Sequence, residues 1–219
     1  MPDRKEMERR SYKFEIRREQ RAEGGSRLSG RAIVYNSPTD IGGWFQEIIE
    51  PGALDGADLT DVPFLVNHND RMIPVARSRR NTPNSTLRLF VNEFGLDFEA
   101  DIDTERNATA RELDSAADRQ DIDGCSFRFS VSDERWENLD TDYPTRHILK
   151  FDKIGEISAV TWPAYESTTL YARSKEALES ARSALESARQ QNAAQPDGGA
   201  ELDLLKQKTK TLTEGIYYA

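Results

Sequence analysis

Short runs in which apolar and polar residues alternate constrain the fold of this chain most strongly. Tyr12, Phe14 and Ile16 alternate with charged residues, and similar runs recur at residues 32–35, 44–49, 62–66, 73–76, 87–91, 96–100, 126–131, 148–151 and 157–162. A period of two is typical of half-buried β-strands. Turn formers such as Pro51-Gly52 separate the runs, and residues 92–95 predict a hairpin loop. About ten short strands without regular βα alternation predict an antiparallel barrel or sandwich.

Two regions have helical patterns instead. Residues 104–123 predict a capped helix that begins at Thr104 and ends before Gly124. In the tail, the heptad of residues 177–183 recurs almost unchanged at 184–190. It places Tyr171, Leu178 and Leu185 on one stripe with Ala181 and Ala188 beside it, which favours an exposed helix over a stable coiled coil. Residues 191–200 are interpreted as a linker and residues 201–212 as a second short helix. The predicted class is α+β, mainly antiparallel β.

Charge divides the 219 residues into three parts. The formal net charge of −9 combines +3 over residues 1–22, −11 over 23–173 and −1 over 174–219. We therefore predict a flexible basic arm at 1–11, a folded domain at 12–173 and a helical tail at 174–219. The acidic balance argues against nucleic-acid binding. With no apolar run of about 18 residues and no signal-peptide pattern, we expect an intracellular chain that does not cross a membrane. The single cysteine excludes an intrachain disulfide.

The chain has only two histidines, and they stand in different contexts. His147 lies in an alternating strand start and is interpreted as an exposed strand residue. His68 follows the apolar run 62–66 and stands among Asn67, Asn69 and Asp70. A buried strand that delivers a histidine into a polar turn suits a general base at a cleft. The alternative is a histidine that stabilises the turn.

Residues 124–131 contain a candidate nucleophile. A period of two directs Phe127, Phe129 and Val131 to the core and Ser126, Arg128 and Ser130 outward. Ser126 could act as a nucleophile with Arg128 as an electrostatic stabiliser, against the alternative of an ordinary amphipathic strand. Cys125 is expected to be a small core residue rather than the nucleophile.

Carboxylates supply two further candidates. Glu156 begins a strand that is otherwise apolar or small, and it could orient a histidine, or it could pair with Lys153 or an arginine. Asp97, Glu99 and Asp101 alternate with apolar residues, and Asp103 continues the series. We interpret them as the solvated face of one strand rather than as a metal or glycosidase site. No metal or cofactor is expected.

Taken in order, these segments resemble the prohead (head maturation) proteases of tailed bacteriophages. The resemblance lies in Gly30–Tyr35; in residues 45–54, similar to E-x-I-x-P-G-A-F; in Asn67-His68-Asn69; in residues 95–100; in residues 124–129, similar to G-x-S-F-x-F; and in residues 156–165, similar to E-x-S-x-V-x-x-P-A-Y. Leu54 stands where phenylalanine is common, and Arg128 stands where a small residue is common.

The resemblance implies a serine endopeptidase with the assemblin-like β-barrel of herpesvirus maturation proteases. Ser126 would be the nucleophile, His68 the general base and Glu156 the orienting acid. Arg128 would contact the oxyanion or the substrate. The implied substrates are the major capsid protein, a scaffold protein and the chain itself, cut inside the assembling prohead in the host cytoplasm. The tail would recruit the protease to the prohead and then be cut away, and residues 191–200 would be an accessible place for the cut. The herpesvirus relatives also imply a homodimer.

Two alternatives stay open at this point. One is a catalytically inactive structural or scaffold protein that keeps the protease fold, although such a protein would be free to lose Ser126, His68 or Glu156. The other is an unrelated β-barrel ligand-binding protein, which the ordered series of motifs disfavours.

Overall fold

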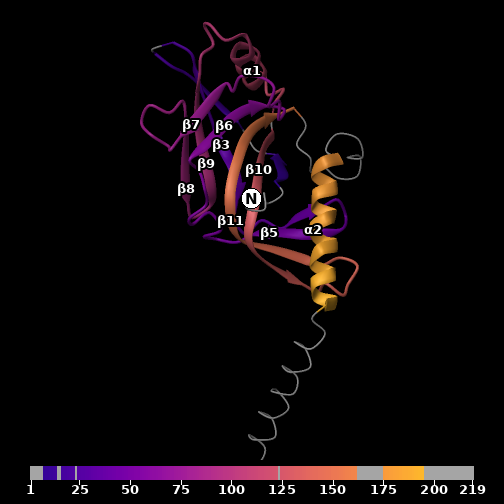
Figure 1. The fold of residues 1–219 in the computed structure, drawn as a ribbon. Helices are drawn as coiled ribbons and strands as arrows, with labels where there is room; N and C mark the ends of the chain where they lie inside the picture. The colour runs from indigo at the N-terminus through magenta and orange to yellow at the C-terminus, as the bar shows by residue number, and fades with distance from the viewer. Residues whose placement is uncertain (1–6, 14–15, 23, 123, 162–174, 195–219) are drawn as a thin grey trace, which may run out of the picture. The chain divides into compact units, whose positions relative to one another are not determined.

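The computed structural model describes residues 7–13, 16–22, 24–122, 124–161 and 175–194. Its strands are β1 (Glu8–Lys13), β2 (Arg17–Gln20), β3 (Ser26–Val34), β4 (Thr39–Ile41), β5 (Phe45–Ile49), β6 (Asp61–Val66), β7 (Ala76–Arg79), β8 (Leu87–Asn92), β9 (Gly95–Ile102), β10 (Gly124–Glu137) and β11 (Thr145–Val160). The helices are α1 (Ala108–Asp118) and α2 (Lys175–Ala194). The predicted α+β class is confirmed (Figure 1). The chain forms two compact units, residues 1–181 and 182–219.

The strands of the first unit form two hydrogen-bonded sheets. In the seven-stranded sheet the order is β1-β10-β11-β5-β4, with β6 paired to β11 and β7 paired to β6. The four-stranded sheet has the order β2-β3-β9-β8. β10 and β11 run side by side (Figure 1), and β11 pairs in parallel with β5 near its start and with β6 near its end. Because the described residues form two sheets, the closed barrel stays a prediction.

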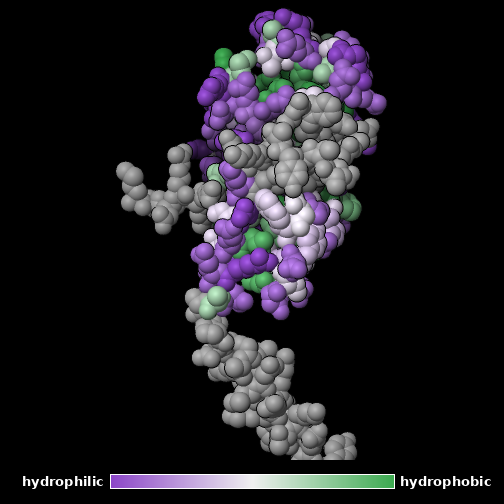
Figure 2. Space-filling view, turned by 90° about the vertical axis from the view of Figure 1, so that its right-hand side faces the viewer, coloured by the Kyte–Doolittle hydropathy of each residue, from purple (hydrophilic) through white to green (hydrophobic). Residues whose placement is uncertain are grey.

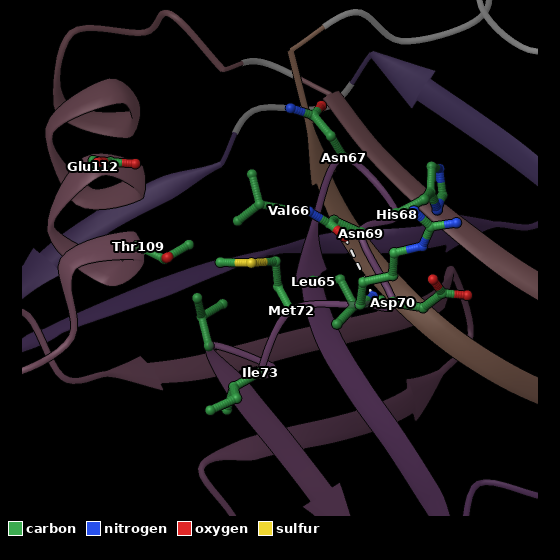
Figure 3. Close-up of a pocket in the computed structure, with 12 residues that line it drawn as sticks. Leu65, Val66, Asn67, His68, Asn69, Asp70, Met72, Ile73, Thr109 and Glu112 are labelled. Carbon is green, nitrogen blue, oxygen red and sulfur yellow. Dashed lines mark hydrogen bonds between the residues drawn. The ribbon is translucent and has the colours of Figure 1, made fainter.

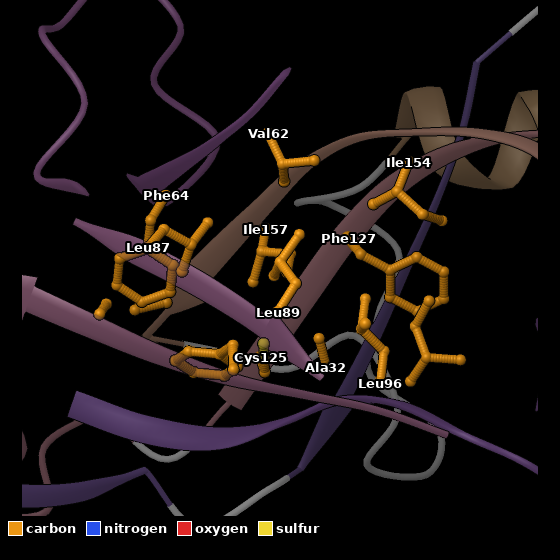
Figure 4. Packing of buried hydrophobic residues seen from close by; sticks show 14 of the residues in the cluster. Ala32, Val62, Phe64, Leu87, Leu89, Leu96, Cys125, Phe127, Ile154 and Ile157 are labelled. Carbon is orange, nitrogen blue, oxygen red and sulfur yellow. The ribbon is translucent and has the colours of Figure 1, made fainter. Parts of the chain in front are cut away.

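Alternation along β10 builds much of the core. Cys125, Phe127 and Phe129 are completely buried, whereas Arg128 between them reaches the opposite face and is partly exposed. The Phe127 and Phe129 rings lie 5.1 Å apart between centroids, and both contact Phe151 of β11. Figure 4 shows Cys125 and Phe127 among apolar side chains of both sheets. The core position predicted for Cys125 is confirmed.

Several boundaries differ from those predicted. β7 begins at Ala76 rather than at residue 73, and Ile73 is 86% exposed, because the segment after β6 turns away from the sheet. α1 begins after Asn107, whose side chain accepts a hydrogen bond from the Ala110 amide (3.2 Å). Asn107 is thus the N-cap in place of Thr104. The predicted hairpin at 92–95 is confirmed between β8 and β9.

The two ends of the chain also differ from expectation. β1 begins at Glu8, so residues 8–11 of the predicted arm pair with β10 instead of remaining outside the fold. The tail helix is present as α2, with Ala181, Leu185 and Ala188 as its buried residues. It extends through residue 194 into the predicted linker. The domain boundary at 173/174 and the predicted helix at 201–212 lie outside the described residues.

The described surface is mostly polar. On the face drawn in Figure 2, hydrophilic side chains outnumber apolar ones among the residues that are coloured. Among the described residues, no helix is both long and apolar enough to span a membrane.

Candidate active site

His68 lies at the point where the chain leaves β6. Leu65 of this strand stands opposite Ser158 of β11, and the Asn67 amide donates to the Ala159 carbonyl oxygen (2.9 Å). Asn67 and His68 then adopt φ values of 52° and 58°. This left-handed conformation is uncommon outside glycine and turns the chain sharply. The turn brings the His68 side chain against β11.

The Asn67 side chain fastens this turn to the end of β11. Its Oδ1 accepts a hydrogen bond from the Thr161 amide (3.0 Å), and its Nδ2 donates to the Thr161 hydroxyl (3.0 Å). A base carried on a turn is held only as well as the turn itself, so these bonds help to fix the position of His68.

Glu156 of β11 is the partner of His68. Its Oε1 makes a short hydrogen bond with His68 Nδ1 and lies 3.4 Å from the Ser158 hydroxyl, which donates to it. Burial would raise the pKa of the Glu156 carboxyl. The hydrogen bond and charge of His68, with the charges of Arg128 and Arg9, outweigh burial and lower this pKa below its usual value. The ionised carboxylate can only accept, so His68 Nδ1 carries the shared proton.

Ser126 lies on the same face of the sheet as this pair. In the regular ladder between β10 and β11, Ser126 stands opposite Ser158, and Arg128 stands opposite Glu156. Directly opposed residues share a face, so Ser126 and Glu156 are diagonal neighbours, about 7–8 Å apart between Cα atoms. The period of two predicts that Ser126 and Ser130 face outward, but both are buried. The Ser126 hydroxyl donates to the Arg10 carbonyl oxygen of β1 (2.8 Å), the strand that pairs with this part of β10.

Arg128 lies beside the carboxylate. Its Nη2 is 3.7 Å from Glu156 Oε2 and 4.0 Å from Asp70 Oδ2. The alternative of pairing with an arginine is therefore present beside the contact with His68, whereas Lys153, the other alternative partner, binds Asp58 (2.8 Å). Of the four predicted site residues, the structure thus joins His68, Glu156 and Arg128 by direct contacts, while Ser126 occupies a neighbouring position on the same face.

His147 is buried, so its interpretation as an exposed strand residue is wrong. Its Nδ1 lies 2.6 Å from Glu50 Oε1, and its Nε2 lies 3.5 Å from a Glu137 oxygen. His147 is buried because both edges of this part of β11 are paired, with β5 on one side and β10 on the other. His147 stands nine residues before Glu156 on the same strand, about 30 Å of extended chain. It therefore belongs to a different place in the fold.

The carboxylates of β9 are partners of arginines. Asp97 accepts two hydrogen bonds from Arg31, and Asp101 accepts two from Arg27. These pairs cross between β3 and β9 on the partly exposed face of the smaller sheet. The predicted solvated face is therefore correct in position, and its charges are paired.

A cavity of about 570 Å³ adjoins His68. The segment that follows β6 forms one wall, and Thr109 and Glu112 of α1 form the other (Figure 3). Met72 and Ile73 line it and are among the exposed large apolar residues. No local pattern in the sequence indicates this cavity, because its walls come from two segments about 40 residues apart.

An ionised carboxylate hydrogen-bonded to an imidazole, with a serine on the adjoining strand, is the set of groups that serine hydrolases use. Comparison with protein families identifies the class more narrowly. Residues 12–182 match the family described as caudovirus prohead serine protease, and the chain belongs to this family. No curated protein and no solved structure matches the chain.

Proposed function

We propose that the chain is the maturation endopeptidase of a tailed-phage prohead, with Ser126, His68 and Glu156 as its catalytic triad. The observation that carries this proposal is the contact between His68 and Glu156 in a member of a serine protease family. The substrates are extensions of the capsid or scaffold protein and the chain itself, cut inside the assembling prohead in the host cytoplasm.

In the proposed reaction, His68 acts through its second nitrogen. Since Nδ1 faces Glu156, Nε2 takes the proton of the Ser126 hydroxyl as Oγ attacks a peptide carbonyl carbon. The imidazolium then donates this proton to the leaving amine, which departs as the acyl-enzyme forms. A water molecule, deprotonated by the same nitrogen, hydrolyses the ester and restores Ser126. Glu156 stabilises the imidazolium in both steps.

The Ser126 hydroxyl has to change partners before it attacks. Its hydrogen bond to the Arg10 carbonyl must give way to one with His68, a change that begins with rotation about the serine side-chain torsion. Hydrogen bonds of catalytic groups often reach their productive geometry only when substrate is bound.

Coexpression with the capsid protein of the same phage tests this function. The wild-type chain is compared with Ser126→Ala by intact-mass spectrometry of both proteins. We expect Ser126-dependent shortening of the capsid or scaffold protein, and self-cleavage within residues 191–200. Ser130→Ala is a matched control because Ser130 is a buried serine on the same strand whose hydroxyl bonds Asp152 (3.2 Å).

The alternative of a catalytically inactive scaffold protein makes a different forecast for this experiment. Such a protein leaves every partner at full length in the wild type and in both variants. Cleavage that survives Ser126→Ala would assign the reaction to another residue and contradict the proposed triad. Cleavage lost equally in Ser126→Ala and Ser130→Ala would indicate damage to β10 rather than loss of a nucleophile.

A further inference from the structure

Arg128 stands directly opposite Glu156 in the ladder of β10 and β11. The side chain of Arg128 is partly exposed, whereas that of Glu156 is almost completely buried. The distance of 3.7 Å between Arg128 Nη2 and Glu156 Oε2 is that of an ion pair rather than of a hydrogen bond. Arg128 therefore acts on Glu156 chiefly through its charge.

The two carboxylate oxygens of Glu156 have different partners. Oε1 meets His68 and the Ser158 hydroxyl, and Oε2 faces Arg128. This division leaves Oε1 turned toward the imidazole. If the Glu156 carboxylate rotated, Oε2 would move away from the Arg128 guanidinium.

Charged groups from three other segments surround this carboxylate. His68 comes from the turn after β6, Arg128 from β10, and Arg9 from β1, where it stands opposite Arg128 in the ladder. Asp70 Oδ2 lies 4.0 Å from the same Arg128 Nη2. A carboxylate buried to this degree is costly to ionise unless cations are close. Arg128 provides such a cation at Oε2, while Oε1 is left to His68.

We infer that Arg128 is a positioning residue whose charge holds Oε2 of Glu156 and so directs Oε1 to His68. The inference rests on the proposed function, since it assigns Glu156 the role of orienting acid. It differs from the oxyanion role predicted from the sequence. An oxyanion donor touches the substrate, so its loss lowers the rate by a similar factor at every pH. Loss of a group that keeps Glu156 ionised instead moves the acid limb of the pH profile.

The direction of the movement follows from the charge. Arg128 lowers the pKa of the Glu156 carboxyl, so removing Arg128 raises the pH at which the His68–Glu156 pair takes up a proton. An opposite charge within 4–6 Å shifts a pKa by about 1–3 units. Because Arg128 is partly exposed, we expect the lower end of that range.

The test measures the rate of Ser126 labelling by a fluorophosphonate from pH 5 to 9, using the full chain. Arg128→Gln removes the charge, and Arg128→Lys keeps it. Arg27→Gln, on the other sheet, makes the same change in net charge away from the site. We expect Arg128→Gln to raise the midpoint of the acid limb by about one pH unit. The midpoints of Arg128→Lys and Arg27→Gln should stay near that of the wild type.

A second measurement does not depend on activity. With only two histidines in the chain, ¹⁵N labelling of histidine gives two imidazole spectra, which His68→Gln assigns. The titration midpoint of the His68–Glu156 pair should move upward in Arg128→Gln as well. Absence of labelling at every pH in the wild type would overturn the proposed function, while the spectra still test the pairing.

Three results would overturn the role of Arg128. One is a uniform fall in rate at all pH values with unchanged midpoints, which an oxyanion donor predicts. Another is an Arg128→Lys variant that behaves like Arg128→Gln. The third is an unchanged imidazole titration in Arg128→Gln, with circular dichroism showing that the variant is folded.

Discussion

Substitution of Arg146 should reveal how a buried charge cluster attaches β1 to the rest of the sheet. Arg146 of β11 donates to both oxygens of Glu8 (2.7 and 2.8 Å) and to Glu47 (3.0 Å). Arg10 binds Glu47 through Nε and Nη2, both at 2.6 Å, and donates to Glu8 (2.8 Å). All four of these residues are at most 6% exposed. β1, which carries the carbonyl bonded to Ser126, is thus held by ion pairs as well as by its backbone.

The cost of Arg146→Met follows from the charges that would remain. Methionine keeps much of the side-chain volume, but the buried carboxylates of Glu8 and Glu47 would then face only the guanidinium of Arg10. One buried negative charge would be left without a compensating cation. Removing one member of a buried ion pair costs about 3–5 kcal/mol. For a domain of this size we expect the melting temperature to fall by roughly 8–15 °C.

Urea unfolding at pH 7 and pH 5 measures this cost and identifies its origin. An unpaired buried carboxylate binds a proton more readily in the folded than in the unfolded chain, so the loss of stability should be smaller at pH 5. Arg88→Met is the control, because Arg88 pairs with Glu99 and Asp101 on a partly exposed face. It should cost less than about 1 kcal/mol. If Arg146→Met cost no more than the control, or cost the same at both pH values, this reasoning would be refuted.

Three further results are expected. Burial would raise the pKa of the Glu8 carboxyl, but Arg146 and Arg10 lower it to about 2. The stability that this group contributes is therefore present above pH 4.5 and is lost as the pH falls toward 2. An acid titration of the folded fraction measures this loss. Burial raises the pKa of the Cys125 thiol to about 12, so iodoacetamide should modify Cys125 only in urea, by mass spectrometry. Gly95 has a φ of 140°, and a Cβ at this position would lie 1.9 Å from the Ile33 carbonyl oxygen. Gly95→Ala should therefore lower the free energy of unfolding, measured in urea, by more than about 1 kcal/mol.

The period of two predicted the parts of the fold that depend on one strand at a time. It assigned Cys125 and Phe127 to the core and Arg128 to the opposite face, and the structure confirms each position. Local turn chemistry likewise predicted the hairpin that ends at Gly95. These features follow from neighbours in the chain, so the local sequence contains them.

Contacts between distant segments could not be derived in this way. Nothing near His147 indicates that Glu50 would cover it, and no pattern joins Arg10 to Glu47 across 37 residues. Such pairs depend on strand order and register, which alternation leaves open. The contact between His68 and Glu156 was expected only through the family resemblance, since 88 residues separate the two.

Active-site labelling of Ser126 tests the central claim most directly. The full chain is treated with a fluorophosphonate, and the modified residue is located by peptide mass spectrometry in the wild type, His68→Gln, Glu156→Gln and Ser130→Ala. We expect a single adduct on Ser126, at least about 100-fold slower in His68→Gln and slowed in Glu156→Gln, with Ser130→Ala unchanged. Labelling of another serine, or labelling of Ser126 at the wild-type rate in His68→Gln, would contradict the proposed triad.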